Sequence, residues 1–413
     1  MSDTAPNCRF CVTPLTTTFA DLGETPLANS YVDPSTAGPS DQAYPLHARV
    51  CSECLLVQVA DAVPPEDIFS DYAYFSSYAQ SWVEHARRYA DMAVARFGLG
   101  PDSKVVEVAS NDGYLLQHFV AKGIPVLGIE PAANVAEAAE ARGVPTRTAF
   151  FGAELARGLR AEGISADLMA GNNVLAHVPD LNDFVAGLAT LLAGDGVLTM
   201  EFPHLLRLIE DTQFDTIYHE HYSYFSLLAV ERIFARHGLK LFDVEELPTH
   251  GGSLRIFAGR ADGPDRGESE GLRKVRADEA AAALDRLETY GGFQVRVEAV
   301  KAGLLDFLAK ASAAGEIVAA YGAAAKGNTL LNFCGVTSDQ IAFVADVSPH
   351  KQNHLLPGSR IPVVAPDELK SRKPDHVLIL PWNLKDEITG DHGYIREWGG
   401  DFVIAVPEIT VLP

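Results

Sequence analysis

Four cysteines occur as two close pairs, Cys8-Arg-Phe-Cys11 and Cys51-Ser-Glu-Cys54. Each C-x-x-C pair places two thiolates on one tight turn, and four such thiolates are typical of a tetrahedral zinc site. A closed shell of four sulfurs leaves no position for water, so we expect a structural zinc that stabilises residues 1–65. A redox-active dithiol is the alternative. The fifth cysteine, Cys334, is expected to be a small buried residue.

A second chemically suggestive stretch runs from Lys104 to Leu116. Its valine-rich beginning predicts a buried strand over 105–108, and the next residues change abruptly to a small, polar turn that ends at Gly113. An apolar pattern at helical spacing follows, so the turn lies at a helix N-terminus with its backbone N–H groups open to a ligand. A second strand over 126–129 leads into Glu130, and an acidic residue there can bind ribose hydroxyls. The NAD fingerprint G-x-G-x-x-G is absent.

Groups that can move protons are concentrated between positions 216 and 225. They are Tyr218, His219, Glu220, His221, Tyr222 and Tyr224. We expect general acid–base chemistry rather than a metal site, because the two histidines share a face only in a strand and no third ligand is evident.

Two further segments offer polar groups. The first, Gly171-Asn-Asn-Val-Leu-Ala-His177, follows a predicted strand at the carboxyl edge of a sheet, where ligands bind. For His177 a hydrogen-bonded structural role is the alternative. The second is an aromatic run that precedes a helix ending near Phe97, where one or more of Tyr72, Tyr74 and Tyr78 is expected to face a cleft; packing is the alternative.

Alternating strands and helices must position these groups. The predicted strands of the central unit are 105–108, 126–129, 146–148, 168–170 and 197–200, followed by an antiparallel hairpin over 239–244 and 253–258. This order predicts a parallel sheet covered by helices on both faces.

A charged helical region over 263–314 leads into a second α/β unit. Its predicted strands are 317–321, 341–345, 377–380 and 402–406. The turn after the first strand, Gly322-Ala-Ala-Ala-Lys326-Gly327, suits a phosphate or diphosphate, although a generic strand-to-helix turn is the alternative. Later turns contain Lys351 and Trp382, and a nucleobase could stack on the indole.

The composition limits the class of protein. The length of 413 residues predicts two or three domains, and the net charge of −22 disfavours nucleic acid as a partner. No apolar run approaches the roughly 20 residues that cross a bilayer, and the polar start does not resemble a signal peptide. We therefore expect a cytoplasmic protein with no membrane partner, and a monomer.

The order and spacing of these motifs resemble the S-adenosylmethionine (SAM)-dependent sugar C-methyltransferases, which add a methyl branch at C-3 of nucleotide-linked 4-keto deoxysugars used in antibiotics and surface glycans. The resemblance implies an α/β protein of three parts. These are a zinc-binding domain (1–65), a class I SAM methyltransferase domain with a Rossmann-like fold (66–262), and a second Rossmann-like domain that binds the nucleotide sugar (263–413).

The same resemblance implies roles for individual residues. His221 would be the base that removes the C-3 proton. The SAM contacts would be Glu107, Ala109, Asn111, Gly113, Glu130 and Asn172. The sugar pocket would be lined by Tyr72, Tyr218 and Glu220, with His177 and Asn173 close to the keto sugar. Of these, Tyr72, Tyr218, Glu220 and His177 are expected to be catalytic together with His221. Lys326 would meet the diphosphate, with Tyr222, Lys351 and Trp382 as further substrate contacts.

Two other functions remain open. The first is an O- or N-methyltransferase that acts on a sugar or another small molecule, which needs no base at a substrate carbon. The second is a non-catalytic protein that binds a nucleotide sugar; the presence of both Glu130 and His221 disfavours it. The sequence does not indicate the nucleotide base (dTDP is expected), the substituents of the sugar or the stereochemistry of methyl addition.

Overall fold

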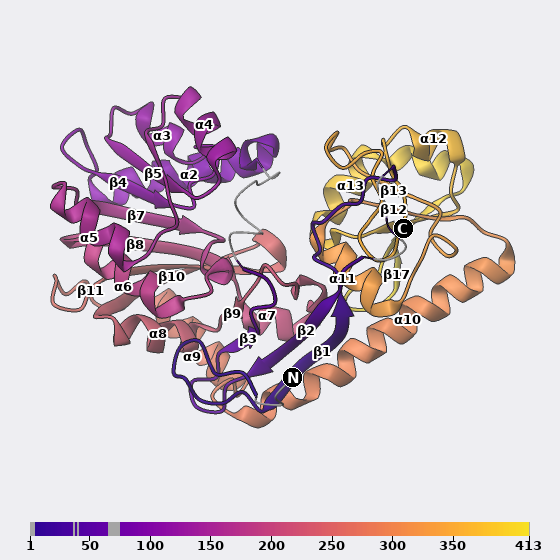
Figure 1. Cartoon of the computed structure of the whole chain (residues 1–413), viewed down its shortest axis with the longest axis horizontal. Helices are drawn as coiled ribbons and strands as arrows, with labels where there is room; N and C mark the ends of the chain where they lie inside the picture. Colours follow the sequence, from indigo (N-terminus) through magenta and orange to yellow (C-terminus); the bar gives the residue numbers. More distant parts are fainter. Residues whose placement is uncertain (1–4, 36–37, 39–40, 65–74, 413) are drawn as a thin grey trace.

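A computed structural model describes residues 5–35, 38, 41–64 and 75–412. Its strands form three sheets, of four, seven and six strands. Figure 1 shows the seven-stranded sheet and its helices as one lobe and the six-stranded sheet as a second lobe. The small N-terminal sheet lies below and between them, alongside the long helix α10 (Phe293–Ala314).

The N-terminal sheet is antiparallel and takes its fourth strand from a distant part of the chain. Its strands are β1 (Thr17–Thr25), β2 (Tyr44–Val50), β3 (Val57–Val59) and β9 (Ser223–Tyr224). Strand β3 pairs with β9, Val57 opposite Tyr224. None of these strands is predicted by the sequence pattern. Because β9 is part of the acid–base segment 216–225, the zinc-binding domain and the candidate active site share one sheet.

The central sheet has the order β10-β11-β8-β7-β4-β5-β6. Its strands are β4 (Val105–Val108), β5 (Val126–Glu130), β6 (Thr146–Thr148), β7 (Ala166–Asn172), β8 (Leu192–Pro203), β10 (Leu239–Leu247) and β11 (Ser253–Arg260). The first five are parallel, and β10 and β11 form the antiparallel hairpin. The predicted doubly covered parallel sheet is therefore confirmed, with β7 and β8 longer than expected.

Helices pack on both faces of this sheet. One face carries α2 (Gln80–Phe97), α3 (Leu116–Val120) and α4 (Ala133–Ala141). The other carries α5 (Ala153–Ala161), α6 (Leu181–Leu191), α8 (Leu227–Arg236) and α9 (Glu270–Ala281). Side-chain caps fix three of the helix starts: Asp180, Ser226 and Ser269 each accept a hydrogen bond from the backbone N–H three residues later.

The C-terminal sheet has the order β14-β13-β12-β15-β16-β17. Its strands are β12 (Val318–Tyr321), β13 (Val344–Ala345), β14 (Val363–Val364), β15 (His376–Ile379), β16 (Asp401–Ile404) and β17 (Thr410–Leu412). The helices α11 (Ala325–Cys334), α12 (Glu368–Arg372) and α13 (Lys385–Asp391) accompany it. The second α/β unit is confirmed, but the predicted strand 341–345 is only two residues long.

One apolar core extends from the N-terminal sheet to the C-terminal unit. It includes Phe19 of β1, which stacks on Phe293 of α10 with ring centroids 4.3 Å apart, and continues to Leu331 of α11. This core crosses the boundaries 1–65, 66–262 and 263–413, which stay predictions. Among the described residues, no helix is both long and apolar enough to span a membrane.

Candidate active site and zinc centre

The four cysteines meet on two similar turns. The Sγ atoms of Cys8, Cys11, Cys51 and Cys54 all lie within 4.8 Å of one another. In each turn the backbone N–H four residues after the first cysteine donates to that cysteine's carbonyl, and the donor residue has a left-handed φ (Val12, 67°; Leu55, 63°). A tetrahedral zinc at the usual Zn–S distance needs sulfurs about 3.8 Å apart. The donor set and spacing therefore fit a structural zinc.

Three alternate residues of the cofactor turn have left-handed backbones. They are Ala109 (φ 54°), Asn111 (φ 48°) and Gly113 (φ 78°). Two of them carry side chains, which makes this conformation unfavourable by about 1 kcal/mol or more each. Hydrogen bonds hold it: the Asn111 N–H donates to Glu130 Oε2 at 3.0 Å, and Asn111 Oδ1 accepts from the Ser76 N–H at 2.8 Å. The backbone of this turn is thus fixed before a ligand binds.

Carboxylates dominate the surroundings of the turn. Glu130 also accepts from the Ala132 N–H at 3.0 Å, and burial raises its pKa. Glu107 is fully buried, and its pKa is raised well above the usual value by burial and by the charges of Glu130 and Asp112. Arg142 compensates part of this charge through an ion pair with Asp112 at 2.6 Å. A ligand with positive charge and hydroxyl donors, as SAM has, suits such a site.

Buried polar atoms without partners lie at the next strand end. Both the amide nitrogen and oxygen of Asn172, at the end of β7, are buried with no hydrogen bond inside the described part of the chain. The same holds for Asn173 Oδ1, and the Asn173 N–H donates to the carbonyl of Glu201 at 2.7 Å. Leaving such groups unpaired costs about 1–3 kcal/mol each, so they are suited to a polar ligand. Together with Glu130, these residues fit SAM.

The acid–base segment gathers around His221. Its Nδ1 lies 2.9 Å from the carbonyl of Thr216, so this nitrogen carries the proton. Its Nε2 lies 2.7 Å from the Tyr218 hydroxyl, which donates to it. The His177 ring lies edge-on, with centroids 4.7 Å apart. Burial and the neighbouring His177 hold the pKa of His221 well below its usual range, so the imidazole is neutral near pH 7.

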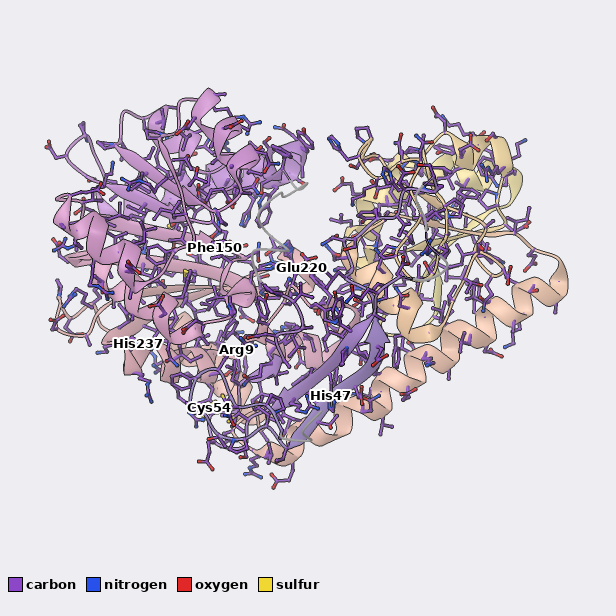
Figure 2. The ribbon with its side chains drawn as sticks, viewed as in Figure 1. Arg9, His47, Cys54, Phe150, Glu220 and His237 are labelled. Carbon is purple, nitrogen blue, oxygen red and sulfur yellow. The ribbon has the colours of Figure 1, made fainter. Side chains whose placement is uncertain are left out.

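Glu220 lies where the two lobes meet (Figure 2). Its Oε1 accepts a hydrogen bond from Asn29 Nδ2 at 2.7 Å, and burial raises its pKa to about 7. His219 faces the opposite way, toward the carbonyl of Pro45. The two histidines of the H-E-H stretch therefore do not converge, and within the described ranges only the four cysteines form a group able to hold a metal.

Tyr222 of the acid–base segment contacts the zinc-binding domain. Its ring is buried, and the guanidinium of Arg9 lies 5.2 Å from the ring centroid. Arg9 follows the zinc-site residue Cys8 and also donates to the carbonyl of Pro179 at 2.6 Å. Tyr72 lies outside the described residues, as does Tyr74.

The C-terminal unit contributes Lys326 and Trp382. Lys326 donates from Nζ to Asn383 at 2.8 Å and lies 4.4 Å from the centroid of the Trp382 ring. Burial lowers the pKa of Lys326, and Asp215 opposes the shift. Trp382 donates its indole N–H to Asp215 Oδ2 at 2.7 Å. Since Asp215 precedes Thr216, which binds His221, these contacts join the C-terminal unit to the acid–base segment.

Lys351 contacts the turn over 322–327, which leads into α11. Its Nζ donates to the carbonyl of Ala323 at 2.8 Å, and the hydroxyl of Tyr31 donates to that carbonyl at 2.5 Å. Neither Tyr31 nor Asn29 is predicted from the sequence. Both lie in a polar connection of the N-terminal domain, and no local signal distinguishes them from ordinary loop residues.

A further cluster surrounds Glu201 at the end of β8. The fully buried carboxylate contacts His85 Nε2 at 3.0 Å, accepts from Arg255 at 2.9 Å and accepts from the Thr249 hydroxyl at 3.2 Å. Burial alone would raise its pKa, but His85 and Arg255 hold the pKa below the usual value. A signal for this cluster exists in the sequence, because Glu201 directly follows the predicted strand 197–200, at the carboxyl edge of a parallel sheet.

Comparisons with known proteins decide the family. Three family models match consecutive segments: a zinc binding domain (residues 8–69), a methyltransferase domain (82–244) and a C-methyltransferase C-terminal domain (248–407). The chain is 36% identical over 405 residues to the C-methyltransferase NovU of Streptomyces niveus, covering 98% of this chain and 96% of that protein. The chain belongs to the C-methyltransferase family. It is a SAM-dependent methyltransferase with a zinc-binding N-terminal domain.

Solved structures of methyltransferases match part of the chain. Magnesium protoporphyrin IX methyltransferase from Synechocystis with bound SAM is 16% identical, with a TM-score of 0.35, and the match covers 49% of this chain and 100% of that one. A SAM-dependent methyltransferase from Clostridium acetobutylicum is 9% identical, with a TM-score of 0.36, covering 44% and 92%.

Proposed function

We propose that this C-methyltransferase methylates C-3 of a nucleotide-linked, dTDP-type 4-keto deoxysugar in deoxysugar biosynthesis. The observation that carries the proposal is the buried His221 imidazole, held between the Thr216 carbonyl and the Tyr218 hydroxyl with the His177 ring edge-on to it. A carbon next to a ketone becomes a nucleophile only after it loses a proton, and a neutral imidazole suits that step. An O- or N-methyltransferase needs no base at a substrate carbon.

His221 receives the proton at Nε2. In the free chain this nitrogen is engaged by the Tyr218 hydroxyl, so the tyrosine must turn to a sugar oxygen before the base acts. The bond from Nδ1 to the Thr216 carbonyl fixes the ring and its tautomer, and it stabilises the imidazolium that forms. Glu220 and Asn29 lie beside this step and bind sugar hydroxyls in our proposal.

The cofactor supplies an activated methyl group on a sulfonium when it is bound. The chain's own residues orient it: Glu130 binds the ribose, while Asn172, Glu107 and the left-handed turn from Ala109 to Gly113 hold the remainder. Alignment of the two carbon centres is the main contribution that the protein makes to the transfer itself.

Local positive charge supports a diphosphate. The net charge of −22 repels anions overall, yet Lys326 and Lys351 flank the turn that begins α11. Helix N-termini and lysines are a common way to bind diphosphates. The indole of Trp382, fixed by its bond to Asp215, offers a rigid face on which thymine can stack.

The proposal is tested by incubating the protein with SAM and dTDP-4-keto-2,6-dideoxyhexose. We expect a product heavier by one methylene, with the new methyl group on C-3 in the NMR spectrum. A methyl group on oxygen or nitrogen, or no methylation by protein that binds SAM, would contradict the proposal and point to another acceptor.

A further inference from the structure

The connection between β10 and β11 contains a strained histidine to which the reaction outlined above assigns no role. His250 has a left-handed backbone (φ 57°, ψ 21°) and stands next to Gly251 (φ 86°) and Gly252 (φ 115°). A left-handed conformation in a residue with a side chain costs about 1–3 kcal/mol. The surrounding structure must therefore hold His250 in place, and such strain is frequent at functional sites.

Close packing holds this connection from both lobes. A Cβ atom on Gly251 would lie 2.4 Å from the Trp382 ring, and one on Gly252 would lie 2.7 Å from the side chain of Arg207. The Thr249 hydroxyl donates to Glu201, and Gln213 donates to the carbonyl of Gly251 at 2.8 Å. The backbone at His250 is thus fixed relative to the Glu201 cluster and to the C-terminal unit.

The His250 ring packs against the methyltransferase domain and lies near charged groups of both lobes. It stacks on Trp82 of α2, with centroids 5.4 Å apart and planes inclined by 16°. The charges of Lys326, Glu201 and His85 act on it, and it acts in turn on His221. The side chain is partly exposed. Burial lowers its pKa to about 4, so the ring is neutral and one nitrogen carries a proton.

His177 packs edge-on against His221, and His250 lies close enough to lower the pKa of His221. Two of these three imidazoles already use their N–H group. His221 donates to the carbonyl of Thr216, and His177 donates to the backbone of Glu220, a contact that raises its pKa. Within the residues that the structure describes, the ring nitrogens of His250 make no hydrogen bond, although neither is sealed from solvent. An N–H donor is therefore available on a rigidly held ring.

We propose that His250 is a further catalytic residue, whose neutral imidazole donates its N–H to the C-4 oxygen of the keto sugar. The inference rests on the proposed function. When His221 takes the proton from C-3, the C–H electron pair becomes the C-3–C-4 double bond and the carbonyl pair moves to the oxygen. The His250 N–H stabilises that oxygen. In the transfer step the C-3–C-4 π pair forms the new bond to the methyl carbon, and the bond from that carbon to the sulfonium sulfur breaks with its electron pair going to sulfur. The oxygen pair then re-forms the C-4 carbonyl, and His250 keeps its proton throughout.

The test measures hydrogen–deuterium exchange at C-3 of dTDP-4-keto-2,6-dideoxyhexose in D2O without SAM, together with kcat and KM. His250→Phe keeps an aromatic ring for Trp82 but has no donor, and we expect exchange and kcat to fall by about 10²–10³-fold. The KM for the sugar and the Kd for S-adenosylhomocysteine should change less than threefold. His250→Asn tolerates the left-handed backbone and keeps a donor, so it should retain activity within about tenfold of wild type.

Controls separate this inference from the proposed function. His237→Phe removes a histidine that Figure 2 shows far from Glu220, and it should exchange like wild type. If His250→Phe does not fold, His250→Gly, which suits the same backbone, should show the loss and recover with added imidazole. Wild-type exchange that persists in folded His250→Phe or His250→Gly overturns the role of His250 alone. No exchange by the wild type overturns the proposed function.

Discussion

Glu130 provides a quantitative test of the cofactor site. Its two carboxylate oxygens accept backbone N–H groups from Asn111 and Ala132, each at 3.0 Å, and their remaining lone pairs are available to ribose hydroxyls. The glutamine side chain of Glu130→Gln is uncharged and has one acceptor oxygen instead of two. One ribose hydroxyl therefore loses its hydrogen bond to a charged acceptor. Such a bond contributes about 1.5–3 kcal/mol, which corresponds to about 10- to 150-fold in a dissociation constant.

Isothermal titration calorimetry with S-adenosylhomocysteine measures this loss. We expect the Kd of Glu130→Gln to rise by that factor. The matched control is Glu137→Gln, an exposed position on α4 of the same domain, whose Kd should equal that of wild type. A Kd within threefold of wild type for correctly folded Glu130→Gln would refute the assignment of Glu130 as the ribose ligand.

Three other predictions concern stability. Wild-type protein should hold one zinc ion per chain by elemental mass spectrometry, whereas Cys51→Ser should hold none. The variant should also have a less stable N-terminal domain, and equal melting temperatures of wild type and Cys51→Ser would count against a structural zinc. Glu279→Gln should lower the free energy of unfolding by about 1–3 kcal/mol in urea, because the buried carboxylate accepts from two backbone N–H groups at the start of α8, whereas exposed Glu270→Gln should not. Burial raises the pKa of Glu220 to about 7, so the folded chain binds more protons than the unfolded chain between about pH 4.5 and 7, and stability falls as pH rises through this window. Urea denaturation at pH 5 and pH 8 should show wild type losing about 3 kcal/mol relative to Glu220→Gln, and parallel curves would contradict this.

Strong local patterns predicted most of the central fold. The valine-rich β4 begins and ends where the sequence indicates, because every one of its side chains is buried. Strand β13 is shorter than expected, since only Val344 and Ala345 pair with neighbouring strands on both sides. The N-terminal sheet depends on the pairing of β3 with two residues of β9, a tertiary contact that no local pattern encodes.

The candidate site was predictable where one motif carries several groups. The Tyr218 to His221 segment is one such motif, and the structure brings Tyr218, His177 and His221 together. Contacts between distant segments were not predictable. Asn29 of the N-terminal domain donates a hydrogen bond to Glu220, and His85 of helix α2 contacts Glu201 on strand β8. The local sequence does not distinguish either residue from other polar residues, because its partner is close only in the folded chain.

Exchange of the C-3 proton tests the central claim most directly. Protein and dTDP-4-keto-2,6-dideoxyhexose are incubated in D2O without SAM, and deuterium at C-3 is followed by NMR for wild type and for His221→Asn. A base at His221 predicts rapid incorporation by wild type and a loss of at least about 10²-fold in the variant, with unchanged binding of S-adenosylhomocysteine. Equal rates of incorporation in the two proteins would contradict the assignment of His221 as the base.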